Sequence, residues 1–246
     1  MPPTTPPKRS GSLLDTLRAQ SDAMRGTNGS NQRAPEELLR DLDRRMWRAF
    51  KWLDEAIGHL KVIRPAIAHD YRLGDVLTIA SPQFDHGFLS FRRKPMGGHD
   101  VVEHIELFYR LAGPEPIELK VSPGGANVID DQLRASQIKF QYRTEQDENR
   151  VVRRGIFTII PAVTAFIKLL PDYRRQTVEV TLRNVDRFET VALEFTADKF
   201  DEGALEDLVR LILGEDNAFL RRAPLVGVGA RKSAPTPNEE ATSYRV

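Results

Sequence analysis

The stretch MGGHDVVEHIELFYRL, residues 96–111, brings together residue types that could bind a metal ion or move a proton. Its two histidines, His99 and His104, and its two acids, Asp100 and Glu103, lie within six residues. Histidines that share a metal are usually four apart on a helix or two apart on a strand, and a spacing of five across a Gly-Gly loop gives neither arrangement. From His104 on, polar and apolar residues alternate, which favours a β-strand. The sequence therefore predicts a strand here and no metal site.

Neighbouring acids and histidines are the next candidates for chemistry. Asp85 precedes His86, and His69 precedes Asp70, so either pair could supply a general base. Neighbours in a strand point to opposite faces, however, which argues against a hydrogen bond within each pair. The chain has no G-x-S-x-G motif and no glycine-rich phosphate loop. A hydrolase-type enzyme that uses His69, His86 or His99 therefore requires the fold to bring one histidine within hydrogen-bond reach of an acid.

Short arginine clusters could bind anions, because guanidinium groups hold phosphate and carboxylate with two parallel hydrogen bonds. The candidates are Arg92, Arg93, Arg150, Arg153, Arg154, Arg174 and Arg175. If several converge in the fold, they form a site for an anionic nucleotide or an acidic partner. The alternative is a surface of salt bridges, since acidic stretches such as EQDEN lie close by in the sequence.

Composition excludes several classes of function. Lys and Arg total 36 against 35 acids, and this balance disfavours a protein held to nucleic acid by charge. The absence of cysteine excludes disulfides, cysteine-ligated zinc, iron–sulfur clusters and thiol catalysis. The N-terminus has no apolar run of signal-peptide length, and no stretch approaches about 20 apolar residues. We therefore expect a cytoplasmic protein without a membrane-inserted segment, a metal or another cofactor.

Residues 35–63 are predicted to form a long amphipathic helix that begins at a proline and ends before Arg64-Pro65. Apolar residues recur every three or four positions and form a heptad seam. The seam consists of Leu39, Leu42, Met46, Ala49, Leu53, Ala56 and Leu60. Trp47, Phe50 and Ile57 widen this stripe beyond that of a two-stranded coiled coil. Two interpretations follow: the helix packs on its own domain, or Leu39, Leu42, Met46, Leu53 and Leu60 contact a partner or a second copy of the chain.

From residue 73 to 197 the apolar pattern changes to the period of a strand. The segments IELKV, QIKFQYR, TVEVTLR and ETVALEF alternate apolar and polar residues, as antiparallel strands with one buried face do. The sequence therefore predicts an α+β fold with a predominantly antiparallel sheet of about seven to eight strands. Residues 122–136 are expected to form a long loop. The segment GIFTIIPAVTAFIKLLP could be one bent strand, two short strands or part of a helix.

A second helix is predicted over residues 201–213, with Asp201 as its N-cap and Gly214 at its end. It should cover the apolar face of the sheet together with the first helix, which gives one α+β domain over residues 35–226. Residues 1–34, which can form one short helix, and residues 227–246 are too poor in apolar residues to fold alone, so we expect disordered tails.

These observations favour a non-catalytic, bacterial-type cytoplasmic protein with an interaction or regulatory role, acting through contacts with a protein partner or by self-association. The first alternative is a small-ligand binder, with an anionic nucleotide at the arginines or an apolar ligand under the sheet. The second alternative is the hydrolase-type enzyme with a His/Asp pair.

Overall fold

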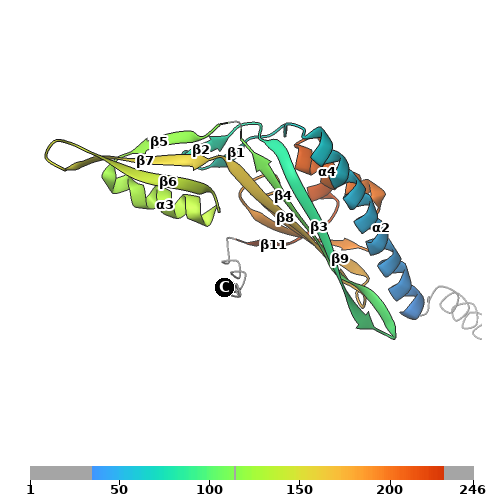
Figure 1. Cartoon of the computed structure of the whole chain (residues 1–246). Helices are drawn as coiled ribbons and strands as arrows, with labels where there is room; N and C mark the ends of the chain where they lie inside the picture. The colour runs from blue at the N-terminus through green and yellow to red at the C-terminus, as the bar shows by residue number, and fades with distance from the viewer. Residues whose placement is uncertain (1–34, 114, 230–246) are drawn as a thin grey trace, which may run out of the picture. The chain divides into compact units, whose positions relative to one another are not determined.

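A computed structural model describes residues 35–113 and 115–229 of the chain (Figure 1). The chain divides into two units, residues 1–41 and 42–246. Helix α2 (Pro35–Ile63) begins in the first unit and belongs to the second from Leu42 onwards. The predicted tails lie outside the described residues, except for residues 227–229.

The described residues form eleven strands in three sheets, and every strand pair is antiparallel. The main sheet has the order β11-β10-β9-β8-β4-β3, with the bounds β3 (Gln83–Met96), β4 (His99–Ala112), β8 (Ala162–Asp172), β9 (Thr177–Arg183), β10 (Thr190–Thr196) and β11 (Leu225–Gly229). The small sheet has the order β5-β7-β6, with the bounds β5 (Ile117–Val121), β6 (Lys139–Gln146) and β7 (Val152–Ile160). A two-stranded sheet consists of β1 (Tyr71–Leu73) and β2 (Leu77–Ile79).

The main sheet buries one of its two faces. Figure 1 shows α2 and α4 (Glu202–Leu213) on the same side of this sheet. The buried side chains on the covered face include Ile105, Leu107, Tyr109, Leu111, Val163, Ala165, Ile167, Leu169, Val178, Val180, Leu182, Leu193 and Phe195. They alternate with half-buried or exposed residues along each strand, because successive side chains of a strand point to opposite faces. The other face of the main sheet carries no helix in the described part of the chain.

Close packing brings α2 against β3 at Gly87. A Cβ atom at this position would lie 3.0 Å from Ile57 Cγ2 and 3.1 Å from Phe84 Cζ. A side chain larger than hydrogen would therefore require Ile57 or Phe84 to shift by a few tenths of an ångström. Further along the same pair, Phe91 contacts Trp47 and Phe50, with ring centroids 5.1 and 4.7 Å apart.

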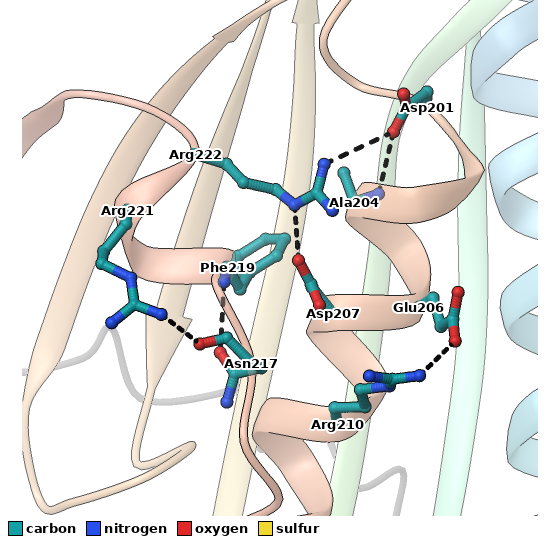
Figure 2. A network of polar contacts seen from close by, with 9 residues as sticks. All are labelled: Asp201, Ala204, Glu206, Asp207, Arg210, Asn217, Phe219, Arg221 and Arg222. Carbon is teal, nitrogen blue, oxygen red and sulfur yellow. Dashed lines mark hydrogen bonds and ion pairs between the residues drawn. The ribbon is translucent and has the colours of Figure 1, made fainter.

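Helix α4 begins and ends at the residues that the sequence suggested, Asp201 and Gly214, and Figure 2 shows the Asp201 cap. Asp201 accepts a hydrogen bond from the Ala204 backbone N–H at 2.9 Å, and Gly214 ends the helix in the left-handed conformation at φ 75°. After the 3₁₀ turn η2 (Phe219–Arg221), Arg222 returns to the helix and donates to the buried carboxylate of Asp207 at 2.5 Å. This ion pair ties the returning chain to α4 before β11 begins.

The α+β class, both helices and the mostly antiparallel sheet are confirmed. The expectation of a loop over residues 122–136 is wrong, because a 3₁₀ turn η1 (Pro123–Gly125) and helix α3 (Ala126–Ala135) occupy it. The apolar segment around Pro161 is two strands, β7 and β8, which belong to different sheets. No helix in residues 35–113 and 115–229 is long and apolar enough to cross a membrane.

Candidate functional site

A β-bulge in β3 shapes the first part of the candidate site. The register with β4 shifts between Phe84, which lies opposite Leu111, and His86, which lies opposite Arg110, so Asp85 is an extra residue. An extra residue bends a strand and re-aims the side chains beside it. Here the Asp85 carboxylate lies 3.0 Å from His86 Nδ1, within hydrogen-bond distance. The expectation that these sequence neighbours do not pair is therefore wrong.

A cavity of about 250 Å³ opens beside this bulge. Its lining residues are His86, Phe108, Tyr109, Arg110, Gln137, Lys139, Ile160, Ala162 and Thr164. They come from β3, β4 and β8 of the main sheet and from β6, β7 and the turn before β6. A concave site with apolar walls and a few polar groups is the usual form of a small-molecule site.

Two cationic side chains line this cavity. Arg110 Nε lies 3.9 Å from Asp85 Oδ2, so the Asp85 carboxylate contacts both Arg110 and His86. Lys139 is exposed, and its ammonium group has no ion-pair partner among the residues that the structure describes. A cation without a counter-ion at the rim of a concave site is available to an anionic ligand.

An aromatic row continues from the cavity across the open face of the main sheet. Phe88, Phe108 and Phe166 lie directly opposite one another on β3, β4 and β8, and we call them the phenylalanine row. The Phe108 and Phe166 ring centroids are 4.6 Å apart, and the Arg183 guanidinium lies 5.5 Å from the Phe166 ring. Phe88 is 62% exposed and Phe108 is 38% exposed. Phe108 belongs to both features, so the cavity and the row are continuous.

The predicted arginine clusters lie in two different sheets. Arg92 and Arg93 lie at the end of β3, and Arg174 and Arg175 lie in the turn between β8 and β9. Arg92 pairs with Glu103 at 3.3 Å, Arg93 with Asp43 at 3.6 Å, and Arg175 with Glu194 through two contacts of 2.7 Å.

The remaining arginines belong to the hairpin between β6 and β7 of the small sheet. Arg150 lies in its turn at φ 60°, and Arg153 and Arg154 lie on β7. Arg153 pairs with Asp147 at 2.7 Å, and Asp147 also accepts backbone hydrogen bonds that hold the turn. None of the seven predicted arginines lines the cavity described above.

The predicted interaction seam lies largely in the chain's own core. Leu42, Met46, Leu53 and Leu60 are buried, and Leu39 at the start of α2 is half-buried. The part of the seam from Leu42 onwards can reach a partner only if the helix leaves the sheet. The structure thus favours packing on the helix's own domain over contact with a partner through these residues.

The other two candidate histidines lie away from the cavity. His69 Nε2 is buried without a hydrogen-bond partner among the described residues, and the Asp70 carboxylate accepts from the Ser81 backbone N–H instead. His99 begins β4, at the hairpin end of that strand. In the described part of the chain, no group of three histidine, aspartate or glutamate side chains could hold a metal ion.

Sequence reasoning named His86 but missed Arg110, Lys139 and Phe108. Arg110 and Phe108 alternate with the buried residues of β4, and Lys139 is one polar residue in an alternating segment. Only the fold brings residues of β4, β6 and β8 to the lining of one cavity. Comparisons with protein-family models, with curated proteins and with solved structures find no match to this chain.

Proposed function

We propose that this chain is a non-catalytic cytoplasmic binding protein whose cavity between β4, β6 and β8 holds a small organic anion. The observation that carries the proposal is the pair of cations, Arg110 and Lys139, which two different sheets supply to one cavity with an apolar wall. Binding of this kind suits a regulatory protein that responds to a metabolite.

Binding is a better interpretation than catalysis. In the Asp85–His86 pair the carboxylate orients the imidazole, as it would for a general base. The His86 side chain, however, is 62% exposed. An imidazole open to bulk water lacks the shielded environment that strengthens electrostatic catalysis. A polar Thr164 and the cationic Arg110 can instead fix the orientation of a bound ligand.

A thermal-shift series tests the proposal. The full chain is heated with a panel of small carboxylates and sulfonates, with chloride at equal ionic strength as the blank. A ligand at about ten times its Kd should raise the Tm by about 3 to 6 °C, because it binds only the folded state.

Lys139→Gln is the deciding variant, and Lys120→Gln is its matched control. Lys120 is an exposed lysine on β5 of the same small sheet and does not line the cavity. The Tm shift should fall in Lys139→Gln and persist in Lys120→Gln. A panel without any shift beyond chloride, or an unchanged shift in Lys139→Gln, would contradict the proposal.

The phenylalanine row favours a second candidate function, which is self-association with a second copy of the chain. A twofold contact needs a face that is complementary to itself, and an aromatic row meets that condition. Two charged groups near it are paired within the chain, Lys168 with Glu106 at 3.0 Å and Arg175 with Glu194 at 2.7 Å, whereas Arg183 lies over the Phe166 ring. Six strands about 4.8 Å apart give a face roughly 25 Å wide.

A further inference from the structure

The size of the cavity limits what it can hold. A cavity of 150 Å³ is enough for benzene, and sites for drug-sized molecules usually measure about 300–1,000 Å³. The cavity here, at about 250 Å³, takes one ring and a short substituent. It is too small to enclose a nucleotide.

The charge around the cavity limits the ligand further. Arg110 and Lys139 carry two positive charges, and Asp85, which lies 3.9 Å from Arg110 Nε, carries one negative charge. Arg110, Lys139 and Asp85 together leave one uncompensated positive charge. A monoanion balances it, whereas a dianionic phosphate ester would leave a negative charge beside the Asp85 carboxylate.

The apolar wall selects for a ring. Phe108 and Ile160 line the cavity and are 38% and 45% exposed, so a ligand would bury both. Aromatic rings favour offset or edge contacts at centroid distances of about 4.5–7 Å, and Phe108 already makes such a contact with Phe166. A ligand ring on Phe108 would extend the phenylalanine row into the cavity.

We infer that the ligand is an aromatic monocarboxylate, with its carboxylate at Lys139 and Arg110 and its ring on Phe108. This inference rests on the proposed function and adds the chemical class of the ligand. In this orientation Thr164 and Gln137 remain as hydrogen-bonding groups for a polar substituent on the ring.

Calorimetric titration of the full chain with four probes tests the inference. Benzoate carries both the ring and the single charge, acetate lacks the ring, benzyl alcohol lacks the charge, and phenyl phosphate carries the ring with a higher charge. Benzoate should bind at least about tenfold more tightly than each of the other three. Lys139→Gln should weaken benzoate about tenfold, the size expected for one charge-assisted hydrogen bond, while Lys120→Gln leaves it unchanged.

Phe108→Leu separates the ring contact from the charge contact. It should weaken benzoate and leave acetate unchanged, because only benzoate places a ring on Phe108. If acetate or phenyl phosphate binds at Lys139 as tightly as benzoate, the inference that the ligand is an aromatic monocarboxylate is contradicted. The proposed anion-binding function is then still supported. If no probe binds and the anion panel also leaves the Tm unchanged, the aromatic monocarboxylate and the proposed anion-binding function are both contradicted.

Discussion

At the scale of single residues, His69 couples protonation to the stability of the fold. Its ring lies 4.7 Å from the Tyr71 ring, and a Cβ atom at Gly214 would lie 2.5 Å from its Nδ1, so the imidazole fills the space left by the glycine. Burial lowers the pKa of His69 by more than the carboxylates of Asp186 and Asp70 raise it. The folded state therefore favours the neutral imidazole.

The free energy of unfolding should consequently depend on pH. Between the lowered pKa of the folded state and the ordinary value of 6.5, the unfolded chain binds more protons than the folded chain. The contribution of neutral His69 to the free energy of unfolding is fully present above pH 6.5. This contribution is lost as the pH falls from 6.5 to the pKa of His69 in the folded state. Denaturant unfolding at pH 7.5 and 5.5 measures this loss.

His69→Phe should reduce the difference between the free energies of unfolding measured at pH 7.5 and at pH 5.5. The phenyl ring keeps the contact with Tyr71, and it removes both the titrating group and a buried nitrogen that has no hydrogen-bond partner among the described residues. His59→Gln, on an exposed face of α2, serves as the control and should leave the difference unchanged. An identical pH dependence in His69→Phe and the unmodified chain would show that other groups cause it.

At the scale of elements, the seam of α2 contributes to stability. Leu53 is 1% exposed, so Leu53→Ala should lower the free energy of unfolding by about 2–5 kcal/mol through lost burial and a new cavity. Val62→Ala, on the same helix at 84% exposure, should change it little. Denaturant unfolding of both variants measures the difference. Similar losses in the two variants would contradict the packing of α2 on the sheet.

The outermost position of β3 explains one arginine cluster. This long strand is an edge strand of the main sheet, and its last residues include Arg92, Arg93, Lys94 and Pro95. Positive charge and proline on an edge strand hinder the addition of a strand from another chain. The ligand site that the sequence suggests here stays a prediction, and edge protection together with the ion pairs of Arg92 and Arg93 is a second explanation for these residues.

Much of each element could be predicted from the sequence, because the side-chain period is a local property. Ile105, Leu107, Tyr109 and Leu111 recur at every second position, which is the pattern of one buried strand face, and all four are buried in β4. The bulge at Asp85 could not be predicted in this way. A bulge depends on how two strands register, and residues on one strand alone do not specify it.

The candidate site depends on tertiary structure to a greater degree. Arg110 and Lys139 lie on different sheets, and helix α3 lies between them in the chain. No local pattern indicates that they line the same cavity. The arginine clusters, in contrast, are conspicuous in the sequence, yet four of the seven arginines form ion pairs with acids in the fold: Arg92, Arg93, Arg153 and Arg175.

At the scale of the whole molecule, the phenylalanine row predicts self-association. Large apolar patches that stay exposed on a folded chain usually mark a contact surface, and Phe88 is the most exposed member of this row. The molar mass of the unmodified chain, measured by light scattering or sedimentation, should rise from monomer to dimer as its concentration increases.

Phe88→Glu should shift this equilibrium toward monomer by at least about tenfold, since dimer formation would then bury a carboxylate against an aromatic ring. Val128→Glu is the matched control: Val128 is 58% exposed on α3, away from the row, so the same change there should leave the equilibrium as it was. Phe88 does not line the cavity, so benzoate binding should persist in Phe88→Glu and show that the variant is folded. A chain that stays monomeric at every concentration, or a dimer that Phe88→Glu and Val128→Glu affect equally, would remove the row as a contact surface.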